Sequence, residues 1–292
     1  MKTNYFPLIK LLRPRQWIKN GFVFIPFIFS GKLTSLSLLF DGLLVFIAFC
    51  FISSSCYILN DLADVEFDRS HYEKKDRPIA SGAIKVSTAL ITMLVIASVA
   101  VTIGFLQSKI IGGIIVFYTV LNIIYSLSLK NIVIVDIFSI ALSFLLRVLA
   151  GAYACTVPPS HWIILMSFSL ALLLAVGKRR VDLLTLPSSS KSHRKVLNSY
   201  SLYTVDQMIV VLIAMIVITF GLFTVSNYAI ERFGTDALVF TVPFVIYGLF
   251  RYLYIINDKG STGDPTTILF TDRHMFLCVL GWLVTCTWIL YK

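Results

Sequence analysis

The chain alternates between long apolar runs and a few short polar segments. A helix needs about 20 apolar residues, within a range of about 17–25, to cross the hydrocarbon of a bilayer. Nine runs approach this length, although the first is short and contains Pro26; together they predict nine spanning helices. Their approximate ranges are 17–31, 36–59, 86–107, 110–128, 132–154, 160–177, 205–228, 235–256 and 274–291. The pattern predicts an all-α polytopic membrane protein.

The composition supports this class. The chain has 292 residues, of which 58% are hydrophobic and 14% charged, with a mean hydropathy of +0.86. Soluble domains average about 45–50% apolar and about 25% charged residues. The five cysteines form no C-x-x-C pair and lie within or beside apolar runs, which indicates buried apolar side chains. Residues 1–19 are basic and lack a small-residue cleavage site, so we expect no removable signal peptide.

Lysine and arginine are unevenly distributed between the predicted loops. If nine helices alternate in direction, 20 of the 25 bases lie on one side of the membrane and four on the other, with Arg147 inside a helix. Basic loops remain preferentially in the cytoplasm. The distribution predicts a cytoplasmic amino terminus, an external carboxyl terminus, and cytoplasmic placement of every long polar loop.

The polar segment 60–85 holds six of the fifteen acidic residues and five bases. On a helix, Asn60, Asp64 and Asp68 are spaced four residues apart and share one face. Neighbouring carboxylates repel each other unless a cation lies between them. Oxygen ligands suit Mg²⁺, which usually takes one or two carboxylates plus substrate phosphates. The segment therefore predicts a metal and phosphate site; a solvated boundary loop, the alternative, has no need of this spacing.

A second polar cluster, residues 177–182, follows the sixth apolar run. Lys178 and Asp182 are four residues apart and share a helical face, with Arg179 beside them. Cytoplasmic charge bias alone also accounts for three bases after a spanning helix. We favour a binding role because a carboxylate and metal site needs an anionic substrate, and that substrate needs cations.

Arg147 lies well inside the predicted spanning helix 132–154. A charge in the hydrocarbon costs at least ~2.5–3.5 kcal/mol on insertion scales, so such a residue usually faces a cavity and a partner. Asp136, eleven residues earlier on the same run, is one partner to consider. The alternative is that Asp136 faces the cytosolic end near Lys130.

Two further segments are polar. Near the amino terminus, Arg15, Gln16 and Lys19 fit one face of an amphipathic helix, and Trp17 suits the headgroup level. A basic interfacial anchor is the alternative for Arg13 and Arg15. The segment from 263 to 274 indicates only a structured polar loop. No motif of nucleophilic catalysis, zinc binding or glycine-rich phosphate binding is present.

The residues Asn60-Asp61-x-x-Asp64-x-x-x-Asp68, followed by Arg77-Pro78 and Gly82, resemble the first aspartate-rich motif of the UbiA superfamily of intramembrane prenyltransferases. The resemblance covers nearly the whole chain. It implies a single domain, 1–292, with nine helices in a UbiA-type bundle around a cytosol-facing polar cavity. The loops at 60–85, 178–204 and 257–273 would face that cavity, and Mg²⁺ would hold a diphosphate there.

One branch of the superfamily is especially similar. Usual members carry a second D-x-x-x-D motif after the sixth helix, whereas residues 177–182 hold one acid, Asp182. This difference, with the segments 13–20 and 263–273, resembles the branch that transfers 5-phosphoribose from phosphoribosyl diphosphate (PRPP) to a polyprenyl phosphate. That reaction releases pyrophosphate and serves cell-envelope glycan synthesis in the bacterial inner membrane. The branch usually has glutamate where this chain has Asp182.

The resemblance also implies roles for individual residues. The catalytic set is Asn60, Asp61, Asp64 and Asp68, of which Asn60, Asp64 and Asp68 would bind Mg²⁺ or Mn²⁺. The substrate-binding set is Gln16, Lys19, Arg69, Lys74, Arg77, Tyr125, Lys130, Arg147, Lys178, Arg179 and Asp182. The expected partners are PRPP, a polyprenyl phosphate lipid and the membrane, and no nucleic acid is expected. The pyrophosphate is expected near the aspartates and the 5-phosphate near the bases of 178–182.

Two other functions match part of the sequence. An aromatic prenyltransferase that uses an isoprenyl diphosphate fits the first motif but lacks the second acidic motif. A secondary transporter would use Arg147 and Asp136 along an ion path. Transporters tend to place acids at the membrane midplane, whereas most acids here lie at a loop boundary beside bases.

The predicted topology can be tested with reporter fusions. Reporters inserted after Asp64 and after Lys178 should both report a cytoplasmic location, because the charge distribution places both polar clusters on one side. A fusion at residue 232 provides the opposite control and should report the external side. Reporters that place Asp64 and Lys178 on opposite sides would contradict both the topology and the site.

Overall fold

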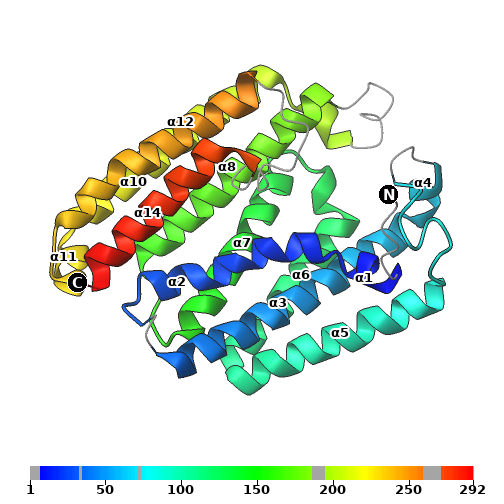
Figure 1. Ribbon diagram of the computed structural model, residues 1–292. Helices are drawn as coiled ribbons and strands as arrows, with labels where there is room; N and C mark the ends of the chain where they lie inside the picture. The colour runs from blue at the N-terminus through cyan, green and yellow to red at the C-terminus, as the bar shows by residue number, and fades with distance from the viewer. Residues whose placement is uncertain (1–6, 33–34, 71–73, 186–194, 259–270, 292) are drawn as a thin grey trace. The chain divides into compact units, whose positions relative to one another are not determined.

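A computed structural model of the chain describes residues 7–32, 35–70, 74–185, 195–258 and 271–291. Within these ranges the regular elements are all helices, which confirms the predicted fold class (Figure 1). The chain forms two compact units. Unit 1 comprises Met1–Leu127 and Leu146–Pro159, and unit 2 comprises Ser128–Leu145 and Ser160–Lys292. Helix α7, Val135–Ala154, is shared between the units because the division falls within it.

Unit 1 is built on three long apolar helices and a helical amino-terminal segment. Its elements, with η for a 3₁₀-helix, are α1 (Pro7–Leu12), η1 (Pro14–Phe24), α2 (Ile25–Ile28), α3 (Leu36–Ala63), α4 (Val65–Ser70), α5 (Val86–Gln107) and α6 (Lys109–Leu127). Helices α3 and α5 run side by side in Figure 1. Extended Ser108 separates α5 from α6, and its hydroxyl accepts a hydrogen bond from the amide of Ile111. Gly104 of α5 and Gly112 of α6 lie in close contact, as small residues do between membrane helices.

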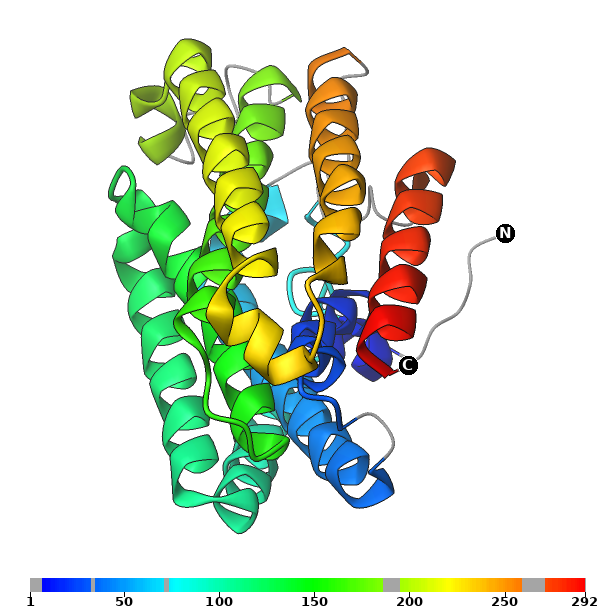
Figure 2. The same cartoon turned by 90° about the vertical axis from the view of Figure 1, so that its left-hand side faces the viewer.

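Unit 2 contains the remaining long helices. Its elements are η2 (Leu129–Asn131), the first half of α7, α8 (His161–Thr185), η3 (Lys195–Ser199), α10 (Leu202–Thr224), α11 (Asn227–Phe233), η4 (Ala237–Thr241), α12 (Val242–Asp258) and α14 (Arg273–Tyr291). Helix α8 packs on α10, and α12 packs on α14. Ser201 and Ser226 cap α10 and α11 through their hydroxyls. Figure 2 shows α11 at the end of α10, before the chain turns into α12.

Eight helices in the described ranges are long and apolar enough to cross a membrane, and the protein is polytopic. They correspond to the second through ninth predicted spans. The first predicted span, 17–31, is not among them, because this stretch forms the 11-residue η1 and the four-residue α2. A 3₁₀-helix rises about 2.0 Å per residue and an α-helix 1.5 Å, so η1 and α2 together extend about 28 Å. That length is close to the hydrocarbon thickness of a bilayer. Neither η1 nor α2, however, has enough residues by itself to be counted among the spanning helices.

Helix α8 is longer than predicted. It continues from the apolar run through the polar cluster to Thr185, whereas the sequence placed its end at 177. The side chains of residues 177–182 are therefore part of a helix. Parts of the three predicted loops, namely 71–73, 186–194 and 259–270 with Gly263, Asp264 and Pro265, lie outside the described residues.

A glycine allows α7 to contact η1 closely within unit 1. A methyl group built on Gly151 would lie 1.9 Å from the carbonyl oxygen of Val23, a backbone atom that cannot move aside. The Gly151→Ala substitution should therefore separate the two elements and reduce the free energy of unfolding by about 1–3 kcal/mol, as overpacking does.

The measurement is denaturation of the purified protein in mixed micelles. Gly113→Ala is the matched control, because a methyl group at this α6 position meets no atom within 4 Å. Equal stability of the two variants would show that α7 and η1 are not in the close contact described.

Candidate active site

The aspartate-rich segment lies where α3 ends and α4 begins, in unit 1. The sequence predicted one helix through Asn60, Asp64 and Asp68, but α3 ends at Ala63 and α4 begins at Val65. Helical hydrogen bonds nevertheless cross this break. The amide of Asp64 donates to the carbonyl of Asn60 at 3.0 Å, and the amide of Asp68 donates to that of Asp64 at 2.8 Å. The spacing that brings these three residues to one side is therefore kept.

Two arginines neutralise the buried aspartates of this segment. Asp61 is 3% exposed, and both of its oxygens accept hydrogen bonds from Nη2 of Arg13, at 2.6 and 2.8 Å. Nη1 of Arg77 donates to Oδ1 of Asp61 at 2.9 Å and to Oδ2 of Asp68 at 2.6 Å. Charge-assisted hydrogen bonds are roughly twice as strong as neutral ones. The carboxylate of Asp61 thus holds two guanidinium groups in place.

Arg13 has a strained backbone. Its φ of 53° and ψ of 56° lie in the left-handed region, directly before Pro14. A residue that precedes proline favours extended conformations, so this one is held by its surroundings. Its guanidinium is bound by Asp61 and lies 5.1 Å from the ring centre of Tyr57. Strain of this kind is frequent at functional sites. Sequence reasoning gave an interfacial anchor as the alternative role of Arg13 and did not predict its contact with the aspartates.

The oxygens of Asn60, Asp64 and Asp68 form a donor set suited to a small cation. Nδ2 of Asn60 donates to Oδ2 of Asp64 at 3.1 Å, so these side chains adjoin. Asp68 is 1% exposed, and its Oδ1 has no hydrogen-bond partner among the described residues. A buried oxygen without a partner is costly.

No three His, Cys, Asp or Glu side chains converge on a complete metal cage within the described ranges. Two carboxylates and an amide match a cation such as Mg²⁺, which fills its other positions with water and phosphate. The residues therefore fit the predicted metal.

The other unit 1 residues predicted to bind substrate are Gln16, Lys19, Arg69, Lys74 and Tyr125. Gln16 and Lys19 are half-buried on η1, and Tyr125 is half-buried on α6. Nζ of Lys74 lies 5.9 Å from the ring centre of Phe67. Arg69 forms an exposed ion pair with Glu66 at 3.0 Å, of a kind that contributes little stability. Substrate binding by these residues stays a prediction.

Arg147 lies inside the membrane-spanning part of α7 and is 4% exposed. Its Nε donates to Oδ1 of Asn20 at 2.7 Å, and its Nη2 donates to the hydroxyl of Tyr118 at 2.8 Å. The guanidinium also lies 4.8 Å from the ring centre of Tyr118 and 5.7 Å from that of Phe49. Neutral dipoles and aromatic faces thus stabilise this charge. The contacts join η1, α3, α6 and α7.

Arg179 and Asp136 form a buried ion pair in unit 2. Nε of Arg179 donates to Oδ2 of Asp136 at 2.7 Å, and the two residues are 2% and 0% exposed. Nη1 of Arg179 donates to Oδ2 of Asp182 at 3.2 Å. The sequence indicated either Arg147 as a partner of Asp136 or a position of Asp136 at the cytosolic end near Lys130. It placed Asp182 on one helical face with Lys178. The structure brings both acids to Arg179.

Sequence reasoning missed several polar contacts of unit 2. Nε of Arg180 donates to Oδ1 of Asp206 at 2.6 Å, and its Nη1 donates to the carbonyl of Ile256 at 2.6 Å. These contacts tie α8 to α10 and α12. The hydroxyl of Tyr200 donates to Oδ1 of Asp136 at 2.7 Å. The available signal for both Asp136 and Asp206 was a lone acid near the start of an apolar helix. Lys130 and Lys178 are half-buried on η2 and α8.

Residues 23–280 match the UbiA prenyltransferase family. The chain belongs to this family. It is accordingly a membrane-bound transferase, in agreement with the resemblance of its aspartate-rich motif.

Similar proteins cover almost the whole UbiA-family chain. The decaprenyl-phosphate phosphoribosyltransferase of Mycolicibacterium smegmatis is 31% identical over 95% of this chain and 90% of its own. That of Mycobacterium tuberculosis is 28% identical, with coverages of 95% and 92%. Among solved structures, a UbiA homolog from Archaeoglobus fulgidus bound to DMAPP and Mg²⁺ has a TM-score of 0.74 at 19% identity, covering 98% of this chain and 99% of that one. The last likeness confirms the fold.

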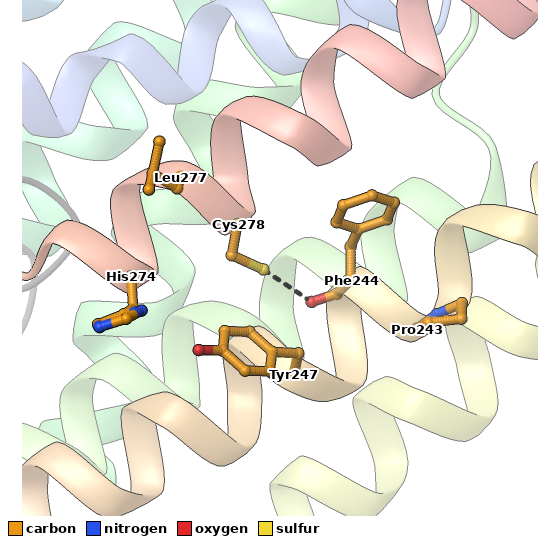
Figure 3. A pocket seen from close by; sticks show the side chains of 6 residues that line it. All are labelled: Pro243, Phe244, Tyr247, His274, Leu277 and Cys278. Atoms are coloured by element: carbon orange, nitrogen blue, oxygen red, sulfur yellow. Dashed lines mark hydrogen bonds between the residues drawn. The ribbon is translucent and has the colours of Figure 1, made fainter.

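A groove of about 380 Å³ lies between α12 and α14 of unit 2 (Figure 3). It is lined by Pro243, Phe244, Tyr247, His274, Leu277 and Cys278. Figure 3 shows the hydroxyl of Tyr247 on the side of His274, and Pro243 at the opposite end. The thiol of Cys278 donates to the carbonyl of Phe244 at 3.1 Å. None of the predicted site residues lines this groove.

Asp272 explains part of the polar segment that precedes α14. Its Oδ1 caps the helix by accepting from the amide of Met275 at 2.9 Å, and Arg251 donates to its two oxygens at 3.1 and 2.8 Å. The hydrogen bonds from Arg251 lower the pKa of Asp272 to about 2. The stabilising contribution of this depressed pKa is present at neutral pH and is lost as the pH falls through about 2.

The role of Asp61 as an anchor for two arginines can be tested by Asp61→Asn. This change removes the charge that Arg13 and Arg77 share, so we expect the free energy of unfolding to fall by about 1.5–3 kcal/mol. Denaturation in mixed micelles measures the loss.

Glu66→Gln is the matched control, because it removes an acid from the same segment whose ion pair with Arg69 is exposed. That variant should unfold within about 0.5 kcal/mol of the wild type. If the two variants are equally stable, Asp61 is not the anchor of the arginine pair.

Proposed function

We propose that this chain transfers 5-phosphoribose from PRPP to a polyprenyl phosphate and releases pyrophosphate, as a step in the synthesis of cell-envelope glycans. The observation that carries the proposal is the composition of the cluster on α8. Usual members of the family have two acids there, whereas this chain has three bases and the single acid Asp182. The similarity to decaprenyl-phosphate phosphoribosyltransferases over 95% of the chain supports the same activity.

The proposed reaction is a displacement at C1 of the ribose. The bond between C1 and the pyrophosphate oxygen breaks, and its electron pair leaves with the pyrophosphate. An oxygen of the lipid phosphate forms the new bond to C1. That oxygen is already anionic near neutral pH, so the reaction needs no strong general base. Positioning and charge stabilisation are therefore the contributions expected of the protein.

We assign the pyrophosphate to the aspartate-rich cluster of unit 1. Asn60, Asp64 and Asp68 would hold Mg²⁺, or Mn²⁺ in its place. A bound divalent cation supplies positive charge that stabilises the departing pyrophosphate. Asp61 is assigned a positioning role, because both of its oxygens bind arginines. Arg77 would also face phosphate, and its hydrogen bond to Oδ2 of Asp68 compensates the charge of that carboxylate.

We assign the lysines and arginines of unit 2 to phosphate groups of the substrates. Arg179 is rigidly held by Asp136 and Asp182, and Lys178 lies next to it on α8. A substrate pair with phosphates at both ends of the ribose donor and on the lipid needs more cations than an isoprenyl diphosphate does. Gln16 and Lys19, on η1, are assigned to the headgroup region of the lipid.

The proposed location is the bacterial inner membrane, with both polar clusters on the cytoplasmic side and the amino terminus in the cytoplasm. The charge distribution of the loops supports this orientation, because 20 of the 25 bases fall on one side of a nine-crossing topology. PRPP is a water-soluble phosphate ester and would reach the site from the cytoplasm, whereas the polyprenyl phosphate would arrive through the bilayer.

The deciding experiment uses the purified protein in lipid nanodiscs. PRPP, a polyprenyl phosphate and Mg²⁺ are added, and both pyrophosphate release and the mass of the lipid product are measured. The proposal requires pyrophosphate release that depends on the lipid and a lipid heavier by one phosphoribosyl group. If the protein ignores PRPP but consumes an isoprenyl diphosphate with an aromatic acceptor, it is an aromatic prenyltransferase.

Asp64→Asn and Asp68→Asn test the assignment of the metal ligands. Each change removes one ligand charge, so we expect kcat to fall about a hundred-fold or more, as when one group that stabilises developing charge is removed. Initial rates over a Mg²⁺ titration provide the measurement. Asp76→Asn is the control, because Asp76 is an exposed acid of the same segment. Near-normal rates of either ligand variant throughout the titration would rule out the assignment.

A further inference from the structure

Ile134, in the turn before α7, has a backbone conformation that is rare for its residue type. Its φ is 70°, in the left-handed region. The branched Cβ of isoleucine clashes with the backbone there, so a β-branched residue in this region is a genuine outlier. Its side chain is 45% exposed, so packing of that side chain does not account for the conformation. Some other contact must hold the turn.

That contact is the hydroxyl of Tyr200. The amide of Ile134 donates to this hydroxyl at 2.7 Å, and the hydroxyl in turn donates to Oδ1 of Asp136 at 2.7 Å. Tyr200 is 7% exposed. Burial, together with the hydrogen bond to Asp136, raises the pKa of Tyr200, so the hydroxyl keeps its proton at neutral pH. One oxygen atom thus accepts from the strained turn and donates to a buried carboxylate.

The same carboxylate continues the chain of contacts to α8. Oδ2 of Asp136 accepts from Nε of Arg179 at 2.7 Å, and Nη1 of Arg179 donates to Asp182 at 3.2 Å. Four hydrogen bonds therefore connect the turn at Ile134 with the basic cluster on α8. All of these groups lie in unit 2. Lys130, on η2, precedes the turn in sequence, and Lys178 directly precedes Arg179 on α8.

We propose that Tyr200 is a positioning residue for the ribose donor. Through Asp136, its hydroxyl connects the turn that follows Lys130 to the segment of α8 that carries Lys178 and Arg179. The bases assigned to phosphate are thereby held in one arrangement before the substrate binds. This inference rests on the proposed function for the identity of the donor, PRPP, but the relay itself does not. Pre-organised cations bind phosphate more tightly because less ordering remains to be done on binding.

Tyr200→Phe tests the relay, because it removes only the hydroxyl. We expect the KM for PRPP to rise about ten-fold or more, as when a hydrogen bond to a charged group is lost. The KM for the polyprenyl phosphate and kcat should change much less. Tyr203→Phe is the matched control, since this tyrosine lies three residues away and is 75% exposed. A Tyr200→Phe enzyme with the kinetics of Tyr203→Phe would overturn the inference.

A second substitution separates positioning from a general loss of stability. Glycine adopts a φ of 70° without a clash, so Ile134→Gly removes the need for the hydroxyl. In the Tyr200→Phe background it should return the KM for PRPP to within about three-fold of the wild type. A double variant as impaired as Tyr200→Phe would show that Tyr200 does not act through the turn.

Hydrogen exchange provides a readout that needs no substrate. The amide of Ile134 should be protected in the wild type and in Tyr203→Phe, and should exchange at least about ten-fold faster in Tyr200→Phe. If the wild type does not use PRPP, the proposed function fails while this measurement still judges the relay. Unchanged exchange in Tyr200→Phe would overturn the relay itself, whatever the substrate.

Discussion

The structure depends on pairing each buried positive charge with a polar partner, because most residues of the chain are hydrophobic. Moving an unpaired guanidinium away from water costs far more than a folded protein can tolerate, so each buried arginine requires a fixed partner. Arg179 has Asp136, Arg180 has Asp206 and the carbonyl of Ile256. These partners lie 26 to 76 residues away in sequence. The ion pairs therefore decide which helices must adjoin, while apolar side chains fill the space between them.

Arginine and lysine have different roles under this constraint. The buried lysines and arginines in the described part of the chain are Arg147, Arg179 and Arg180, so no lysine is among them. The planar guanidinium makes several directed hydrogen bonds at once, whereas the lysine ammonium is a compact, strongly hydrated charge. Arginines consequently build the framework of both polar clusters. Half-buried lysines, such as Lys74 and Lys178, supply charge at the margin of that framework.

Backbone strain occurs where polar contacts hold it. Arg13, Ile134 and Thr156 are the non-glycine residues with positive φ in the described ranges. Arg13 is bound by Asp61, the amide of Ile134 donates to Tyr200, and the hydroxyl of Thr156 accepts from Nζ of Lys32. Arg13 contacts Asp61 of the aspartate-rich segment, and the turn at Ile134 is connected through Tyr200 and Asp136 to Arg179. This distribution is expected if the turns are shaped to place charged groups and the hydrogen bonds offset the cost.

The amino-acid sequence by itself determined the class of the protein, eight of its nine predicted spans and the helical spacing of the aspartate-rich segment. These features depend on local properties, because a run of about 20 apolar residues predicts a spanning helix and polar residues at intervals of four share a helical face wherever they occur. The first span was the exception, since the stretch around Pro26 formed a short 3₁₀-helix and one α-helical turn. The short length of that run and the presence of Pro26 were the local signs of the difference.

Only the tertiary structure decided which charges meet. From the sequence, Asp136 could pair with Arg147 or lie at the cytosolic end near Lys130. In the folded chain it accepts hydrogen bonds from Arg179 and Tyr200. Asp61 likewise binds two arginines, Arg13 from the segment that precedes α3 in the chain and Arg77 from the segment that follows it. The partner of a side chain depends on where helices that are distant in sequence meet. Helical periodicity predicts on which face of its own helix a side chain lies, but not which other helix that face contacts. Burial then makes each pairing obligatory, because hydrocarbon offers a charge no alternative partner.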